Sequence, residues 1–163
     1  MSAIAGADSK VVPQGFKTLA HVAELQQAAS CALTTPTTAT VLTDADCWAA
    51  GQQQPAASAG GPTIGAVAGT ITLAKTALYR GSWGQSDITV VNGQVVTGQL
   101  FGGAAGTTAL GGICKTTQLT AAPCALAGSC LFEGTAGDII SLKMIASTGN
   151  YTSAAGFILI EEV

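Results

Sequence analysis

The sequence predicts an all-β fold, an antiparallel jelly-roll sandwich, with an N-terminal extended arm and a short helix in front of it. Short β-branched runs alternate with glycine-rich turns from residue 31 to the end of the 163-residue chain. An Asn-Gly pair at 92–93 separates two valine-rich runs, and the chain ends on an apolar segment at 156–163. Many short strands with glycine-rich turns and little helix are typical of sandwiches and jelly rolls.

Residues 1–30 are expected to form the arm. Pro13 and Gly15 interrupt its start, where no hydrophobic period is visible. From 16 to 29 the apolar residues fall three apart, which predicts a narrow apolar stripe on a short helix. Such a stripe could cap the domain, dock on a neighbour or start a self-associating bundle, and an ordinary packed helix or an irregular arm explains it equally well. The residues expected to make arm contacts are Val11, Val12, Phe16, Leu19, Val22 and Leu25.

Residues 31–163 are expected to form one β domain, because a chain of this length holds one core and not two. The threonine-rich segment 31–48 favours extended backbone, and Pro36 places it at a sheet edge or at the start of a strand. The stretch 51–62, GQQQPAASAGGP, is a loop by composition.

The strongest local turn signal is Asn92-Gly93, within SDITVVNGQVVTGQL. This pair can supply the positive φ angles of a two-residue hairpin turn. We therefore expect a hairpin in which Val90 faces Val95, with Ile88 on the same side.

The last two predicted strands have different patterns. Ile140, Leu142 and Met144 alternate with polar residues, as in a half-buried strand. The segment from Phe157 to Ile160 is continuously apolar, which predicts that both of its faces are buried. The C-terminus is therefore expected to close the fold.

Charge is scarce in this chain. Charged residues make up 9% of it, against about 25% in an ordinary soluble domain, while hydrophobic residues make up 48%. A surface covered by Ser, Thr, Gln, Gly and Ala suits burial against neighbouring molecules. The composition therefore indicates a protein that packs against copies of itself.

The composition also disfavours several classes of function. The six Lys and Arg residues are scattered, so there is no basic stripe for nucleic acid. No segment has the roughly 18 apolar residues of a membrane span, and the N-terminus lacks the basic and apolar regions of a secretory signal. We expect a chain made in the cytoplasm that binds neither nucleic acid nor membrane.

No catalytic, cofactor-binding or metal-binding residue is predicted. His21 is the only histidine and lies in the expected arm, which makes it a poor candidate for a general base. Asp44 and Asp46 lack EF-hand spacing and are better explained as a solvated loop. The adjacent Glu161 and Glu162 would point to opposite sides of a strand. An enzyme is therefore disfavoured.

The five cysteines do not form a zinc motif, because no two of them are spaced as CxxC. They are Cys31, Cys47, Cys114, Cys124 and Cys130. Buried free thiols are their ordinary interpretation. A disulfide from Cys114 to Cys124 or Cys130 stays open for a particle in an oxidising medium.

The aromatic side chains are few. A stacking platform for sugars could use Trp48, Tyr79, Trp83 and Tyr151. Packing in a core or a subunit interface is the more ordinary role of Trp and Tyr, and we favour it here.

Four segments of the C-terminal part carry a resemblance to a known family. They are 73–83 (LAKTALYRGSW), 90–101 (VVNGQVVTGQLF), 135–144 (TAGDIISLKM) and 156–163 (GFILIEEV). In kind and order they resemble the trimeric jelly-roll family that includes tumour necrosis factor and the globular heads of complement-type and collagen-like proteins. Tyr79, Gly137-Asp138 and Phe157 match the family's strand leading into the core, its turn before a strand and its aromatic-led last strand.

The resemblance covers about residues 64–163, and residues 1–60 have no counterpart in the family. It implies a homotrimer. The residues expected to pack in the trimer interface or the core are Tyr79, Trp83, Phe157 and Leu159. The order of arm, short helix, threonine-rich segment and jelly roll in this chain also resembles the head domains of phage fibres, virion spikes and capsid decoration proteins. In those proteins a short anchoring arm precedes a trimeric jelly roll.

The leading hypothesis is a virion structural protein, made in the host cytoplasm. It would be a bacteriophage capsid decoration, or cement, protein that stabilises the shell as a homotrimer, with its arm bound to the major capsid protein or another virion component. The first alternative is a receptor- or glycan-binding head of a phage fibre or spike. The second is a secreted cytokine-like trimeric ligand. None of these functions needs a cofactor.

Overall fold

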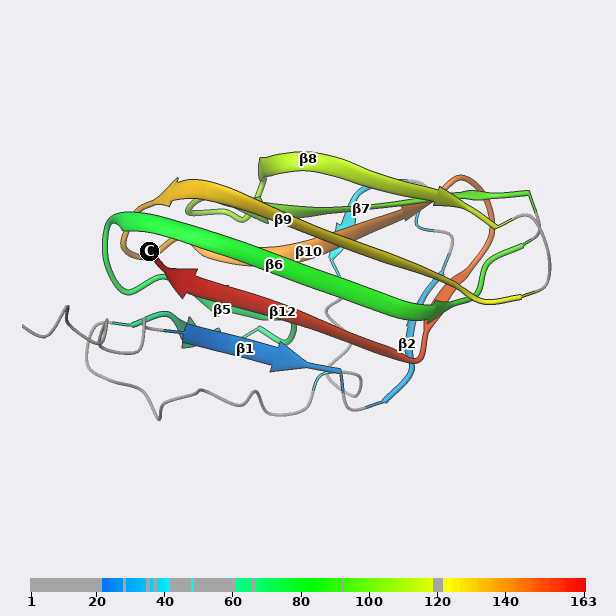
Figure 1. Ribbon diagram of the computed structural model, residues 1–163, viewed down its shortest axis with the longest axis horizontal. Coiled ribbons are helices and arrows are strands. Elements are labelled where there is room, and N and C mark those ends of the chain that lie inside the picture. The colour runs from blue at the N-terminus through cyan, green and yellow to red at the C-terminus, as the bar shows by residue number, and fades with distance from the viewer. Residues whose placement is uncertain are drawn as a thin grey trace, which may run out of the picture.

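The chain folds into two stacked antiparallel β-sheets, with no helix in the part of the chain that the structure describes (Figure 1). The computed structural model describes residues 22–27, 29–34, 36, 38–41, 48, 61–65, 67–91, 93–118 and 122–163. The all-β jelly-roll prediction is confirmed. Within these ranges there is no helix long and apolar enough to cross a membrane.

The front sheet holds the first described strand and the last strand side by side (Figure 1). Its strands lie in the order β1 (Val22–Gln26), β12 (Ala155–Glu162), β6 (Ala77–Ile88) and β9 (Cys124–Gly134). β12 pairs with β1 on one side and with β6 on the other. The C-terminal strand therefore lies inside the sheet, as expected of a terminus that closes the fold.

The back sheet is built around β10 (Ile139–Ala146). Its strands lie in the order β4 (Thr63–Ile64), β5 (Thr70–Thr72), β10, β7 (Val95–Gly102) and β8 (Thr108–Thr117), and β3 (Thr40–Val41) also pairs with β10. A separate two-stranded sheet consists of β2 (Cys31–Leu33) and β11 (Tyr151–Ser153). β8 lies beside β9, so the edges of the two main sheets meet there (Figure 1).

The core lies between the inner faces of the two sheets. Ile140, Leu142 and Met144 of β10 are 1% exposed or less, as predicted, and Lys143 between them is more exposed. Ser141 departs from the predicted alternation, because it is also buried at 2% exposure. Directly in front of β10, the Asp138 carboxylate accepts a hydrogen bond at its Oδ2 from the Thr135 N–H at 2.9 Å. This contact fixes the turn from which the strand starts.

Glycines make room for large side chains in the core. A Cβ on residue 98 would lie 2.5 Å from the Trp83 Cη2 atom. A Cβ on residue 81, in the middle of β6, would lie 2.6 Å from the Leu100 Cδ1 atom. Contacts this short do not occur between real side chains, so the packing of the two sheets depends on glycine at both positions.

The predicted helix over 16–29 is wrong where the structure describes it, because residues 22–26 form strand β1. Ala23 and Leu25 are buried at 0% and 1% exposure, and the residues beside them are more exposed. Pairing with β12 satisfies the backbone of this segment, and such long-range pairing outweighs a weak helical period. Residues 16–21 lie outside the described residues.

The predicted Asn-Gly hairpin is also wrong, because the turn connects the two sheets. The Gln94 N–H donates to the Val91 carbonyl at 3.2 Å, so a turn does form. However, β6 pairs with β9 and β12, whereas β7 pairs with β8 and β10. Val90 therefore does not face Val95 in a hairpin. The local turn chemistry does not decide which strands pair.

Only one face of the last strand is fully buried. Ile158 and Ile160 are 0% exposed, whereas Phe157 is 37% exposed and Leu159 is half-buried. The prediction that both faces are buried is wrong for the face that Phe157 and Leu159 share. That face is the outward surface of the front sheet.

Replacement of Gly81 by Ala is expected to lower the free energy of unfolding by about 1–3 kcal/mol, because the new methyl group overpacks the core against Leu100. Chemical denaturation monitored by circular dichroism measures this. The matched control is Gly112→Ala, since a Cβ there meets nothing within 4 Å, and a change below about 0.5 kcal/mol is expected. Equal effects of the two variants would contradict the packing argument.

Candidate assembly interface

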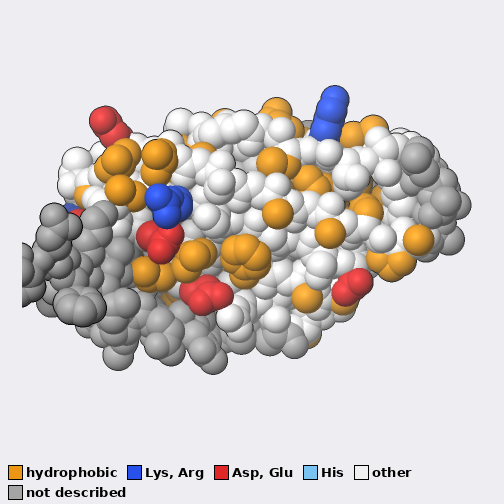
Figure 2. Space-filling model, in the orientation of Figure 1, with side chains coloured by type: hydrophobic (Ala, Val, Ile, Leu, Met, Phe, Trp, Pro, Cys, Tyr) orange, Lys and Arg blue, Asp and Glu red, His pale blue; other side chains and the backbone are white. Residues whose placement is uncertain are grey.

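The outward face of the front sheet carries several exposed apolar side chains among small, polar and charged ones. The charged residues on it are Glu24, Arg80, Glu133 and Glu161. Leu131, Leu78 and Phe157 are 59%, 42% and 37% exposed. Arg80 and Glu161 neutralise each other across neighbouring strands, with 3.8 Å between Nη1 and Oε2. Figure 2 shows this face, on which hydrophobic side chains lie among uncharged side chains and a few acidic and basic ones. Covering the apolar part of this surface costs little hydration energy, but the carboxylates of Glu24 and Glu133, which have no ion pair among the described residues, would have to stay in solvent.

Small residues are aligned across one end of this face. Gly84 of β6 lies opposite Phe157 of β12 and Ala127 of β9. The Phe157 ring lies over Gly84, since a Cβ on residue 84 would be 2.7 Å from the Phe157 Cε1 atom. These residues, with Ala125 and Ala155, line a hollow of about 650 Å³. The hollow lies at the end of the sheet opposite to the C-terminus, because β12 begins there.

A buried polar cluster lies next to this hollow. Gln85, which is 2% exposed, accepts hydrogen bonds at its Oε1 from the Ser153 hydroxyl at 2.7 Å and the Tyr151 hydroxyl at 3.2 Å. The Gln27 Nε2 donates to the Ser153 carbonyl at 2.7 Å. The cluster therefore joins the small sheet, through β11, to β6 of the front sheet and to the residue that follows β1.

One amide donor of this cluster, the Gln85 Nε2, makes no hydrogen bond to the described residues. It lies against Gly156, where a Cβ would be only 2.0 Å away. A buried amide donor without a partner costs about 1–3 kcal/mol. Both Gln85 and Gly156 line the hollow.

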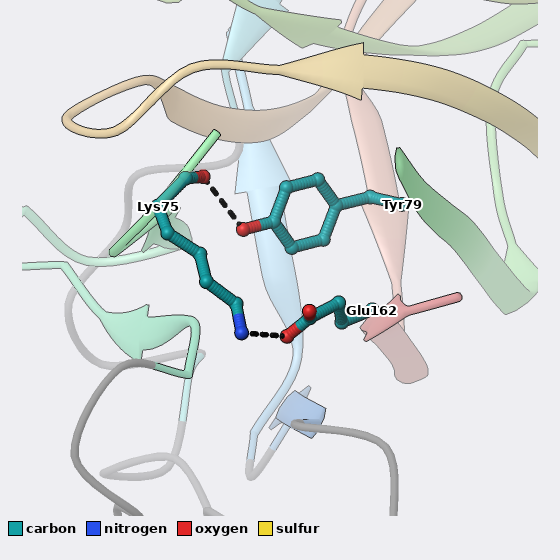
Figure 3. Close-up of polar contacts among 3 residues, drawn as sticks. All are labelled: Lys75, Tyr79 and Glu162. Atoms are coloured by element: carbon teal, nitrogen blue, oxygen red, sulfur yellow. Dashed lines mark hydrogen bonds and ion pairs between the residues drawn. The ribbon is translucent and has the colours of Figure 1, made fainter. Parts of the chain in front are cut away.

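At the opposite end of the front sheet, three residues tie the turn before β6 to the last strand (Figure 3). The Lys75 Nζ lies 2.8 Å from the Glu162 Oε2, and the Tyr79 hydroxyl donates to the Lys75 carbonyl at 2.8 Å. Burial raises the pKa of Tyr79 and the negative charge of Glu162 raises it further, while the hydrogen bond to Lys75 lowers it. Tyr79 is 0% exposed, so this cluster can hold the fold together but cannot reach a substrate.

The residues predicted to pack in a core or trimer interface fall into two groups. Tyr79 and Trp83 lie in the core at 0% and 3% exposure. Phe157 and Leu159 lie on the outward face of the front sheet. The proposed sugar platform does not form, because its four aromatic side chains are at most 6% exposed. These are Trp48, Tyr79, Trp83 and Tyr151.

The predicted arm contacts are placed only in part. Val22 is half-buried and Leu25 is buried, both in β1. The other predicted arm residues, and the polar candidates of the N-terminal part, lie outside the described residues. These are Val11, Val12, Phe16, Leu19, His21, Asp44 and Asp46.

The described cysteines do not form the disulfide that the sequence left open. Cys114, Cys124 and Cys130 are free thiols, and Cys31 is disulfide-bonded. Burial raises the pKa of Cys124 and of Cys130, so a smaller fraction of each is thiolate at neutral pH. No group of three or more metal-binding side chains occurs among the described residues.

Sequence reasoning did not find the hollow. Its wall combines small residues from strands that are distant in the chain, such as Gly84, Ala127 and Ala155. Glycine and alanine carry no signal of their own that a ligand or partner lies above them. The pairing of β6 with β9 and β12 is what brings them together.

Comparisons with known proteins identify the fold. No protein-family model matches the chain, and no curated protein matches its sequence. The structure of Eiger TNF from S. frugiperda is similar, with a TM-score of 0.67 and 14% identity over 89% of this chain and 93% of that one. PRD1 vertex protein P5 has a TM-score of 0.55 and 12% identity over 89% and 98% of the two chains. The globular domain of zebrafish complement 1qA protein has a TM-score of 0.52 and 11% identity over 83% and 94%.

These similarities show a TNF-like jelly roll, and they confirm at the level of fold the resemblance seen in the sequence. The matched share exceeds the part of the chain, 64–163, on which that resemblance was based.

Tyr79 and Tyr151 are the only two tyrosines, and burial raises the pKa of both above the ordinary value of 10.0. The unfolded chain loses these protons near pH 10 and the folded chain keeps them. Their contribution to stability is therefore full below pH 10 and is lost as the pH rises above it. A titration followed by tyrosinate absorbance and circular dichroism should show ionisation together with unfolding. In each of the variants Tyr79→Phe and Tyr151→Phe, the remaining tyrosine should still ionise only as the chain unfolds. Ionisation of a tyrosine near pH 10 while the circular dichroism still shows the folded state would contradict the prediction.

Proposed function

We propose that the protein is a virion structural protein that decorates a capsid shell as a homotrimer, and that it acts by binding rather than by catalysis. The observation that carries this proposal is the group of exposed apolar side chains, Leu78, Leu131 and Phe157, on the outward face of the front sheet. A TNF-like fold shared with a protein named as the PRD1 vertex protein supports a place in a virion.

Self-association would use this face together with an edge of the sandwich. A closed three-fold ring needs two different patches that fit each other. The front face offers Leu78 and Leu131, and the edge strand β8 offers Ile113, which is 66% exposed. Leu78 and Leu131 are diagonal neighbours on adjacent strands, and exposed apolar side chains that adjoin one another mark interaction surfaces more often than single ones do. We propose that the β8 edge of one copy packs on the front face of the next.

The low charge of the chain favours such contacts. On the front face Arg80 is paired with Glu161, whereas Glu133, opposite Leu78, has no ion pair among the described residues. The contact would have to leave the Glu133 carboxylate in solvent. Burial of the exposed leucines would then contribute at about 25 cal/mol per Å² of apolar area.

The residues in front of β1 would anchor the trimer to the shell. β1 starts at Val22, opposite Glu161 and close to the C-terminus. The anchoring contacts with the major capsid protein or another virion component would come from Val11, Val12, Phe16 and Leu19.

A second function is favoured by a specific observation. The hollow beside Phe157 is open to solvent at one end of the front face, which suits a receptor- or glycan-binding head of a fibre or spike. A secreted cytokine-like ligand has the same fold, and a cleaved leader peptide on the secreted chain would distinguish it.

The trimer proposal predicts a mass three times that of the 16.0 kDa chain in light scattering. Leu131→Lys should weaken association by about tenfold or more, because it places an unpaired charge in an apolar contact. The control is Ala136→Lys, at an exposed turn between β9 and β10, which should leave the mass unchanged. A wild-type monomer at micromolar concentration, or equal effects of the two lysines, would contradict the proposed interface.

The anchoring proposal predicts that a chain without residues 2–20 keeps its trimer mass and its unfolding temperature, because β1 remains intact. It should no longer sediment with capsids of the virus that encodes it. In the full chain, Phe16→Ser combined with Leu19→Ser should have the same effect, while Thr18→Ser should not. Full co-sedimentation of the shortened chain would rule out the arm as the anchor.

A further inference from the structure

The hollow on the front sheet combines an apolar wall with one carboxylate. Small residues, Gly84, Ala125 and Ala127, form its wall, and the ring of Phe157 borders it. Among the described residues that line the hollow, Glu24 is the sole charged one. A slot of this kind fits an aliphatic chain that carries a cation, and it offers no counter-charge to an anion.

The Glu24 carboxylate is directed toward this hollow. Glu24 pairs with Leu159 across the strands, and Gln26 pairs with Phe157 one row further along. The Gln26 Nε2 donates to the Glu24 Oε1 at 2.9 Å, which draws the carboxylate toward the row of Phe157. Glu24 has no ion pair among the described residues. When a neighbour covers this face, the carboxylate must therefore stay in solvent or meet a cation that the neighbour supplies.

Strand β8 carries a lysine that has no ion pair among the described residues. The Cys114 thiol lies against Gly128 of β9, since a Cβ on residue 128 would be 2.8 Å from the Cys114 Sγ atom. Because side chains alternate along a strand, Ile113 and Lys115 on either side of Cys114 point out of the sandwich. Both are exposed. The β8 edge thus presents one apolar side chain and one cation to a neighbour.

Three-fold symmetry decides which part of the front face these two residues meet. This step rests on the proposed trimer, in which β8 of one copy lies along the front-sheet strands of the next. Strands related by a three-fold rotation stay parallel only if they run along the rotation axis, and the rotation then leaves the height of each residue along that axis unchanged. A residue of β8 therefore meets front-face residues of the next copy that lie at its own height.

The strand registers place Lys115 at the height of the hollow. β8 lies beside β9 (Figure 1) and runs antiparallel to it, because Gly111 lies against Cys130 while the thiol of residue 114 lies against residue 128. Lys115 is therefore level with Ala127. Ala127 pairs with Gly84 in the row of the hollow.

The other carboxylate without an ion pair on this face is too far along the strands. Glu133 lies six residues beyond Ala127 on β9, roughly 20 Å at about 3.3 Å per residue. The four-carbon stem of Lys115 does not reach that far. Glu24 lies in the row next to the hollow, so it is the carboxylate within reach.

We infer that the hollow receives Lys115 of the next copy, with its methylene stem over Phe157 and its ammonium group on the Glu24 carboxylate. The exposed ring of Phe157 favours a cation in the same place. Ile113 of that copy packs on Leu159, one row away. This inference adds to the trimer proposal the register of β8 on the front face and the one charged contact that fixes it.

The test reverses the two charges in the full chain, singly and together. Light scattering over a dilution series measures association, and circular dichroism checks that each variant is folded. Lys115→Glu and Glu24→Lys should each weaken association about tenfold, because each places two like charges at the contact. The two combined should associate within about threefold of the wild type, since the pair is restored with its signs exchanged.

Two controls separate this contact from a general effect of charge. Lys143→Glu changes the net charge exactly as Lys115→Glu does, but it lies on the outward face of the back sheet and should leave association unchanged. Lys115→Glu combined with Glu133→Lys should stay as weak as Lys115→Glu alone, because Glu133 lies at a different height.

Each outcome has a distinct meaning. Rescue by Glu24→Lys and not by Glu133→Lys supports the inference. Rescue by Glu133→Lys instead would overturn the register and leave the trimer proposal standing. A wild-type trimer that neither single reversal weakens would rule out the ion pair alone. A wild-type chain that is monomeric at micromolar concentration would remove the trimer proposal and this inference together.

Discussion

The pairing of β12 with β1 and β6 is the interaction on which the rest of the structure depends. β12 is the last strand, yet it lies inside the front sheet and is hydrogen-bonded on both sides. Its register directs Ile158 and Ile160 into the core, and it directs Phe157 and Leu159 outward. A shift of one residue would exchange these two faces. The core, the outward face and the hollow all follow from this one register.

The core fixes that register by close packing rather than by polar contacts. Gly81 lies opposite Ile160 of β12, and a side chain on residue 81 would collide with Leu100 of the back sheet. Sheets that approach so closely accept few alternative arrangements. The polar cluster of Gln85, Tyr151 and Ser153 closes the other end, where one amide donor of Gln85 has no partner among the residues that the structure describes. The end with the unpaired donor is also the end that carries the hollow.

The strand pattern was predictable wherever one face of a strand is buried. Ile140, Leu142 and Met144 recur at every second position because their side chains lie in the core, and the sequence predicted their burial correctly. The segment 22–26 was not predicted as a strand, because Ala23 is too small to be recognised as a core residue before its partner strand is known. The Asn-Gly turn was recognised as a turn, but the strands it joins belong to different sheets. Long-range strand pairing determines both the conformation of residues 22–26 and the sheets that the Asn-Gly turn connects. This pairing cannot be derived from one sequence.

The candidate site was less predictable than the fold, for a related reason. The expected sugar platform relied on Trp and Tyr, which the core uses instead. The hollow relies on the absence of side chains at Gly84 and Ala127, which has meaning only after the strands are aligned.

The same alignment separates two regions of one face. Arg80 and Leu131 lie opposite each other, and Gly84 of the hollow follows Arg80 by four residues on β6. At about 3.3 Å per residue this places the two rows roughly 13 Å apart. The leucines and the hollow are therefore separate rows of one outward face, and a neighbouring copy whose ten-residue β8 lies along that face would cover both.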